Sequence, residues 1–171
     1  MAFIGNKERF EIDLPELELK PVVEEDINFL RKLYGSIREE ELKLTDWNAD
    51  QKAAFIEQQF TAQHRYYTEN YTGAQFDVIL IQGIPAGRLY LVEWEQKIRI
   101  IDIAFLQEFR GHGWGSHILQ SLLDKGRTDQ KKIGIHVENY NPAMRLYLRL
   151  GFVPTEDKGV YQYMVWAPDK K

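Results

Sequence analysis

The chain has 171 residues, of which 44% are hydrophobic and 28% charged, as expected for one globular domain with a substantial core. It contains no cysteine, which excludes disulfides, thiolate metal sites and a cysteine nucleophile. The formal net charge is −4 and no Lys/Arg stripe with interleaved aromatic residues is present, so we expect no nucleic-acid partner. No stretch is long and apolar enough for a signal peptide or a membrane span, so the sequence predicts a single cytoplasmic domain over residues 1–171 with no membrane partner.

The charge is unevenly distributed along the chain. Residues 1–57 hold 8 Lys and Arg against 14 Asp and Glu, a balance of −6, whereas residues 110–149 hold 7 against 3, a balance of +4. An acidic segment suits a cationic ligand, and a basic segment suits an anionic one such as a phosphate-bearing cofactor. Solvated surface charge explains the same asymmetry, so charge alone does not decide between these interpretations.

The first half of the sequence predicts a short strand, two helices and a hairpin. The segment "LELKPVVEEDINFLRKLY" is typical of a strand followed by a helix near Glu24–Tyr34, with acidic residues in the first turn, where the helix dipole favours them. A second helix is expected over Asp50–Tyr67. Phe76–Gly83 and Arg88–Trp94 are predicted strands joined by the turn Ile84–Gly87.

The middle of the sequence predicts a central strand, a helix and another strand. Ile98–Leu106 is almost continuously apolar, as expected for a strand that is covered on both faces. After three glycines, a helix follows whose apolar face is formed by Ile118, Leu119, Leu122 and Leu123 and which is expected to end near Lys125–Gly126. Lys131–Glu138 is the next predicted strand.

The C-terminal part predicts a short helix and a last strand. Asn141 is a suitable N-cap, Pro142 suits the first helical position, and Gly151 can close a helix over Pro142–Leu150 in the left-handed conformation. Val160–Trp166 alternates as a strand, and an edge strand there could support a homodimer. The element order is that of a mixed α/β fold with one central sheet flanked by helices.

The segment "FRGHGWGSHIL" places Gly111, Gly113 and Gly115 between a buried strand and an amphipathic helix. A helical glycine is about 1 kcal/mol less favourable than alanine, so three of them suggest exposed backbone. The first amides of a helix lack intrahelical partners and attract anions such as phosphate. A Walker A loop and the G-x-G-x-x-G fingerprint both fail on this sequence, whereas Arg-x-x-Gly-x-Gly matches from Arg110; a glycine turn without a ligand is the structural alternative.

These residues resemble the GNAT superfamily of N-acetyltransferases. "DIAFLQEFRGHGWGSHILQSLL" resembles its acetyl-CoA-binding motif, and "HVENYNPAMRLYLRLGF" is similar to its second signature, a strand followed by Asn-x-x-Ala/Met and Leu-Tyr-x-x-x-Gly-Phe. The likeness extends from Leu17 to Trp166. It implies a GNAT-like α/β fold with a mixed sheet of about six or seven strands, splayed between the fourth and fifth, and about four helices.

The resemblance also implies where acetyl-CoA binds. Its diphosphate is expected on the amides of Arg110 to Ser116, and its pantetheine arm along the central strand, near the backbone of Ile103 to Phe105. The implied cofactor-binding residues are Ile103, Ala104, Phe105, Arg110, Gly111, His112, Gly113, Trp114, Gly115, Ser116, Asn141 and Tyr147.

Tyr147 is the expected catalytic acid. Its phenol is expected to protonate the CoA thiolate as the tetrahedral intermediate collapses, an assistance of roughly 10²–10⁴-fold in rate. A core tyrosine on the helix face shared with Ala143 is the structural alternative.

The general base is expected to be His136, because its intrinsic pKa suits proton transfer and it ends the strand where other family members carry a glutamate. Arg99 and Ile101 occupy the positions on the central strand where many members carry an acid or a histidine. Asp102 is predicted by alternation to face the opposite side and to be structural. Glu93, Glu138 and direct attack by a neutral amine are the remaining alternatives for this step.

In this family the first two helices and their loop usually shape the acceptor pocket, so Tyr34, Trp47 and Tyr67 are expected to bind the substrate. Aromatic and acidic residues together can hold an ammonium group. The function implied is an acetyl-CoA-dependent N-acetyltransferase that acts on a primary amine of a small molecule or peptide, without a covalent enzyme intermediate and without a metal. The alternatives are a non-catalytic acyl-CoA-binding module of the same fold and a donor with a longer acyl chain.

Overall fold

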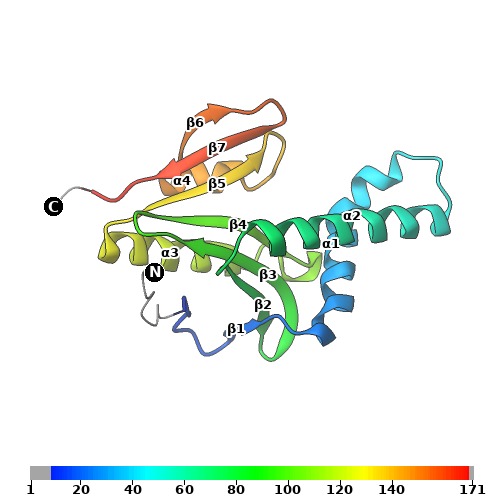
Figure 1. Cartoon of the computed structure of the whole chain (residues 1–171), viewed down its shortest axis with the longest axis horizontal. Helices are drawn as coiled ribbons and strands as arrows, with labels where there is room; N and C mark the ends of the chain where they lie inside the picture. Colours follow the sequence, from blue (N-terminus) through cyan, green and yellow to red (C-terminus); the bar gives the residue numbers. More distant parts are fainter. Residues whose placement is uncertain (1–8, 170–171) are drawn as a thin grey trace.

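The computed structural model describes residues 9–169 as a mixed sheet between two layers of helices (Figure 1). Residues 1–8, part of the stretch searched for a signal peptide, lie outside the described residues, as do residues 170–171. In chain order the elements are β1 (Leu17–Pro21), the 3-10 helix η1 (Glu24–Asp26), α1 (Ile27–Lys43), α2 (Ala49–Asn70), β2 (Gln75–Ile81), β3 (Ile84–Glu93), β4 (Lys97–Phe105), the 3-10 helix η2 (Gln107–Phe109), α3 (Trp114–Asp129), β5 (Lys132–Glu138), α4 (Met144–Leu150), β6 (Val153–Asp157) and β7 (Tyr161–Trp166). The predicted mixed sheet with about four flanking helices is therefore confirmed.

The strands lie in the order β1-β2-β3-β4-β5-β7-β6, and only β4 and β5 run parallel. The prediction that Val160–Trp166 forms an edge strand is wrong, because β7 lies between β5 and β6. Strand β6 could not be predicted from its sequence, because its five residues, Val153–Asp157, show no apolar alternation and are all exposed.

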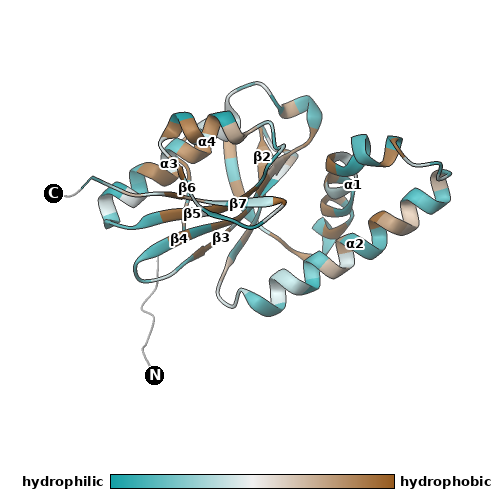
Figure 2. Ribbon diagram, turned by 90° about the horizontal axis from the view of Figure 1, so that it is seen from above, coloured by the Kyte–Doolittle hydropathy of each residue, from teal (hydrophilic) through white to brown (hydrophobic). Residues whose placement is uncertain are grey.

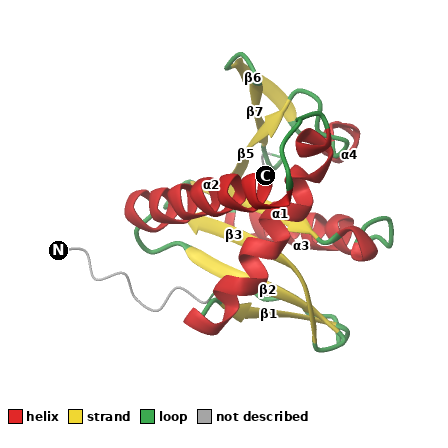
Figure 3. Ribbon diagram, turned by 90° about the vertical axis from the view of Figure 1, so that its right-hand side faces the viewer, coloured by secondary structure: helices red, strands yellow, loops and turns green. Residues whose placement is uncertain are grey.

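Two apolar clusters hold the helices on the sheet. The larger cluster lies between the strands and α3 and α4, and the smaller one joins α1 and α2 to the opposite face. Figure 3 shows α3 and α4 on one side of the strands and α1 and α2 on the other. Figure 2 shows hydrophobic residues along the strands and in bands on the helices, where they alternate with hydrophilic ones. The predicted inner face of α3 is confirmed, since Ile118, Leu119, Leu122 and Leu123 are at most 2% exposed.

Three predicted helix boundaries are wrong. Helix α1 does not end near Tyr34 but continues to Lys43. Helix α3 does not end near Gly126 but continues to Asp129, and Gly126 is buried where a Cβ would lie 2.7 Å from Trp166 Cζ3. This glycine therefore allows β7 to approach the helix. Helix α4 begins at Met144 and not at Pro142, while Gly151 ends it with the predicted left-handed conformation at φ 101°.

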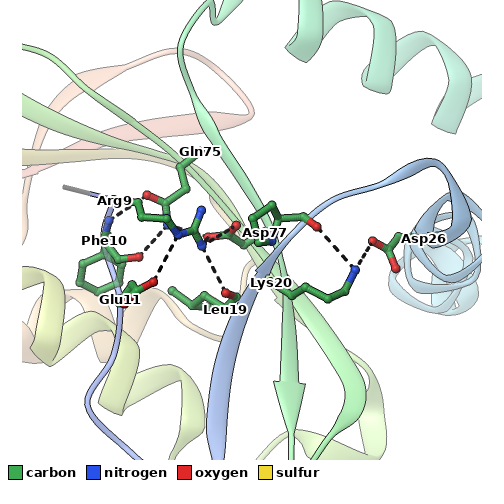
Figure 4. Close-up of polar contacts among 9 residues, drawn as sticks. Arg9, Phe10, Glu11, Leu19, Lys20, Asp26, Gln75 and Asp77 are labelled. Carbon is green, nitrogen blue, oxygen red and sulfur yellow. Dashed lines mark hydrogen bonds and ion pairs between the residues drawn. The ribbon is translucent and has the colours of Figure 1, made fainter. Parts of the chain in front are cut away.

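The segment before β1 is fixed to the sheet by a polar cluster (Figure 4). Asp77 is fully buried and accepts hydrogen bonds from Arg9 Nη2 at 3.1 Å and from Gln75 Nε2 at 2.6 Å. Gln75 also exchanges two hydrogen bonds with the backbone of Phe10, at 2.9 and 2.7 Å. These bonds hold the Phe10 ring, which is 8% exposed, in the larger apolar cluster.

Candidate active site

The glycine turn before α3 presents free backbone donors. Gly111 and Gly113 have φ angles of 77° and 85°, a region that other L-residues rarely adopt, and a Cβ at either would meet nothing within 4 Å. The first amide with a helical acceptor is that of His117, which donates to Gly113 O at 3.0 Å. The amides of residues 114–116 therefore precede the hydrogen-bonded part of the helix and lie at the positive end of its dipole. This open, donor-rich turn fits a diphosphate.

The side chains of the turn differ in their surroundings. Arg110 Nε donates to the carbonyl oxygen of Phe105 at 2.9 Å, which ties the exposed guanidinium to the end of β4. Trp114 packs against the larger apolar cluster, so its indole belongs to the core and its amide remains for an anion. His112 is exposed and Ser116 is half-buried.

A slot opens where β4 and β5 separate. Their pairing covers only Lys97–Ile100 with Lys132–Ile135, although β4 continues to Phe105 and β5 to Glu138. Ile103, Ala104 and Phe105 remain paired with β3 on one side, while no strand among residues 9–169 pairs with their other edge, which faces the slot. The predicted splay between the fourth and fifth strands is thus confirmed, and it exposes backbone groups along which an extended ligand can bind.

A β-bulge at the slot changes the direction of Asp102. Leu91 pairs with Ile100 and the adjacent Tyr90 with Asp102, so Ile101 is an extra residue. Ile100 and Ile103 both face the larger cluster, which leaves Asp102 on the α2 side together with Arg99. The prediction that Asp102 points away from the Arg99 side is therefore wrong, because the bulge breaks the strict alternation on which it rested.

Asp102 is held by a buried arginine. Arg88, 3% exposed, donates through Nε to Asp102 Oδ2 at 2.5 Å and through Nη2 to Gln63 Oε1 at 2.9 Å. Oδ2 also forms the ion pair with Arg88 Nη2, whereas Oδ1 has no hydrogen bond or ion pair with a residue of the described part of the chain. Because the Asp102 side chain is 25% exposed, this second oxygen is available to a ligand in the slot.

Tyr147 lies on α4 and is 4% exposed, with its ring edge-on to Phe152 at 5.6 Å between centroids. Burial raises the pKa of its phenol well above the usual range, and the nearby negative charge of Asp102 raises it further. The phenol is therefore protonated at neutral pH and is within electrostatic reach of Asp102. This is the protonation state that a general acid needs.

His136 is the first residue of β5 beyond the last pair with β4. It lies on the side opposite the buried Ile135 and Val137, and its ring lies 4.8 Å from that of Tyr163. Burial lowers its pKa below the ordinary 6.5, and the positive charges of Arg99 and Lys158 add to this effect. The imidazole is therefore neutral at pH 7 and able to accept a proton.

The other two predicted carboxylate bases occupy different places. Glu93 pairs with Lys125 and Lys131 at 3.3 and 3.6 Å, at the end of β3 that is farthest from the slot. Glu138 is exposed at the end of β5, 3.8 Å from Arg38.

The prediction that Asn141 is the N-cap of the helix is wrong, because the N-cap of α4 is Ala143, two residues later. Asn141 Oδ1 accepts from the amide of Ala143 at 2.8 Å, in the turn before α4, and the Asn141 side chain is exposed. This geometry orders the link between β5 and the helix that carries Tyr147.

The three predicted substrate residues do not form one pocket. Tyr34 is buried against Phe60 in the smaller cluster, with 5% exposure. Trp47 packs on Phe55 near the N-terminal end of α2. Tyr67 lies twelve residues after Phe55 on that helix, which places the two residues about 18 Å apart along the helix axis. Only Tyr67 approaches the slot, since Asp102 and Arg88 both influence its pKa, which burial raises.

Comparison with known proteins agrees with this geometry. The family model described as Acetyltransferase (GNAT) family matches residues 37–152. One similar solved structure is the PaiA N-acetyltransferase of Thermoplasma acidophilum in complex with coenzyme A, which is 12% identical over 88% of this chain and 98% of that chain, with a TM-score of 0.66. Another is an acetyltransferase of Thermus thermophilus, which is 16% identical over 92% of this chain and 99% of that chain, with a TM-score of 0.65. RimL, a ribosomal L7/L12 alpha-N-protein acetyltransferase, in complex with coenzyme A is 19% identical over 91% of this chain and 96% of that chain, with a TM-score of 0.59. The comparison with curated proteins gave no match.

The fold and the glycine turn thus define a protein of the acetyl-CoA-binding α/β class. More particularly, the chain belongs to the GNAT acetyltransferase family and is an acetyl-CoA-dependent acyltransferase. This assignment favours the transferase over the non-catalytic binding module. Within residues 9–169 no helix is long and apolar enough to cross a membrane.

Proposed function

We propose that the protein transfers the acetyl group of acetyl-CoA directly to a primary amine of a small molecule or peptide, without a covalent enzyme intermediate. The observation that carries this proposal is the slot between β4 and β5, which has a protonated phenol and a neutral imidazole near its opening. Two similar structures are named as an N-acetyltransferase (PaiA) and an alpha-N-protein acetyltransferase (RimL), which supports a nitrogen acceptor. The expected cytoplasmic location remains a prediction from the sequence.

The cofactor is held, in this proposal, by the residues of the turn and the open edge of β4. The amides of residues 111–116 bind the diphosphate, whereas the amide of Arg110 already donates to the carbonyl oxygen of Gln107 at 3.1 Å. The backbone of Ile103 to Phe105 binds the pantetheine arm. When bound, acetyl-CoA supplies an acyl group activated as a thioester. Asn141 contributes by ordering the turn that leads into α4.

Three side chains handle the charges and protons of the transfer. Asp102 Oδ1 attracts the ammonium form of the acceptor to the α2 side of the slot. His136 first accepts one proton from the ammonium group, so that a neutral amine with a free lone pair forms the C–N bond to the thioester carbon. The second proton that this nitrogen loses replaces the one that Tyr147 gives to the sulfur. Tyr147 donates its proton to the sulfur as the C–S bond breaks, which avoids release of a bare thiolate.

A panel of amines tests the proposal, with free thiol and acetylated product both measured. We expect acetyl-CoA-dependent product with at least one class among small amines, amino acids and N-terminal peptides. The variant Tyr147→Phe keeps the ring and the packing against Phe152 but removes the acid, so kcat should fall about 10²–10⁴-fold while CoA still binds. An unchanged kcat in this variant refutes the role of Tyr147, and absence of acetylation on every amine refutes the acceptor class.

A further inference from the structure

A second cavity lies on the α1–α2 side of the sheet. Its volume is about 410 Å³, which is within the roughly 300–1,000 Å³ of ordinary ligand pockets. The side chains that line it are mainly apolar or aromatic and come from four elements and their connections: Val22, Val23, Ile27, Phe76, Tyr90 and Tyr67. None of these residues has a role in the function proposed above, although Tyr67 is one of the substrate residues expected from the sequence.

A filled wall separates this cavity from the slot. The rings of Tyr67 and Tyr90 meet edge to face at 6.0 Å, and the guanidinium of Arg88 covers Tyr90 at 4.9 Å from the ring centroid. Tyr90 and Arg88 are only 2% and 3% exposed, and Arg88 also binds Asp102, so these two packed side chains lie between the cavity and Asp102. A molecule in the cavity is therefore a different ligand from the acceptor in the slot.

The walls favour an apolar or aromatic body. Phe76 lies edge to face with Tyr90 at 4.8 Å, and together with Tyr67 these rings form a continuous aromatic surface. His64 also lines the cavity and adds little positive charge, because burial and the nearby Arg88 lower its pKa below 6.5. Aromatic faces of this kind also attract cations.

The charge at the cavity is negative. Glu24 lines it, and no ion pair of Glu24 is found within residues 9–169. The ammonium of Lys20, on the neighbouring strand β1, is bound to Asp26 at 2.7 Å (Figure 4), so it does not neutralise Glu24. An apolar chamber with one uncompensated carboxylate at its edge is complementary to a molecule with an apolar body and one positive charge.

We propose that this cavity binds an amphipathic monoamine, with its apolar body against Tyr67, Phe76 and Tyr90 and its ammonium group at Glu24. The inference is independent of the proposed acetyl transfer, because it concerns a space that the slot does not reach.

Calorimetric titration with three probes of one shape tests this inference, in the presence of saturating CoA and without acetyl-CoA. The probes are 2-phenylethylamine (cationic), 2-phenylethanol (neutral) and 3-phenylpropionate (anionic). We expect the amine to bind most tightly and the carboxylate most weakly. Glu24→Gln should weaken amine binding about two- to fivefold and leave alcohol binding unchanged. Glu25→Gln makes the same change in net charge at an exposed neighbour outside the cavity and should have little effect.

A second pair of variants tests the location without relying on charge. Thr68 lines the cavity on α2, so Thr68→Trp should fill it and abolish binding of the amine and the alcohol. Thr61→Trp, exposed on the same helix outside the cavity, is the matched control and should bind normally. The inference is overturned if no probe binds, if the carboxylate binds best, if Glu24→Gln and Glu25→Gln act alike, or if Thr68→Trp binds as the control does.

Discussion

The two glycines that flank the start of α3 should respond oppositely to alanine. Gly113, at φ 85°, is in the left-handed region, where an L-residue is about 1–2 kcal/mol less favourable, so Gly113→Ala should lower the free energy of unfolding by that amount. Gly115 lies within the first helical turn, and a Cβ there would make an ordinary 3.6 Å contact with Phe105 Cε2. Gly115→Ala should therefore raise the free energy of unfolding by up to about 1 kcal/mol through helix propensity.

The Kd for CoA should also differ between the two variants. Relief of strain in Gly113→Ala moves the amides of the turn, and loss of one hydrogen bond to a charged phosphate is worth about 1.5–3 kcal/mol, or roughly 10- to 150-fold in Kd. Gly115→Ala leaves these amides in place, because its Cβ contacts Phe105, and Kd should change less than about threefold. Urea unfolding without ligand and calorimetric titration with CoA measure both quantities. Equal stability of the two variants, or equal loss of CoA binding, refutes the assignment of the turn as a backbone anion site.

Three further predictions concern buried or titrating side chains. Gly126→Ala should lower the free energy of unfolding by about 1–3 kcal/mol, because the new Cβ would lie 2.7 Å from the Trp166 ring, and this clash outweighs the better helix propensity of alanine. Urea titration measures this change, and unchanged stability would show that β7 can shift freely. Asp77→Ala should destabilise the fold by about 2–4 kcal/mol, since it leaves Arg9 and Gln75 without their buried acceptor, and a loss below about 1 kcal/mol contradicts the role of this cluster. If His136 is the base, the acid limb of the kcat/KM profile lies below pH 6.5, because activity is lost as pH falls through its lowered pKa. Arg99→Gln should move that limb upward and His136→Gln should remove it, whereas a limb that stays in place in both variants assigns it to another group.

Much of the candidate site could be predicted from the sequence because it depends on local backbone chemistry. Glycines at positions 111 and 113 are needed for left-handed φ angles, and an amphipathic helix must follow them to supply free amides and a dipole. The apolar face of α3 and the left-handed cap at Gly151 are likewise set by residues close together in the chain. The same local rules gave the number of helices and the order of most elements.

Other features depend on contacts between residues that are distant in sequence, so only the tertiary structure decided them. Gly126 lies inside a helix because its missing Cβ leaves room for Trp166, which is distant in sequence. The exposed strand β6 forms because β7 offers it a ladder of hydrogen bonds. Asp102 reaches the slot because a bulge against β3 reverses its face, and buried Arg88 then holds one of its oxygens. Alternation along one strand cannot reveal a bulge, since its position is set by pairing with another strand. The sequence by itself therefore determined the family and the glycine turn, whereas the direction of the side chains around the slot was decided only when the strands came together.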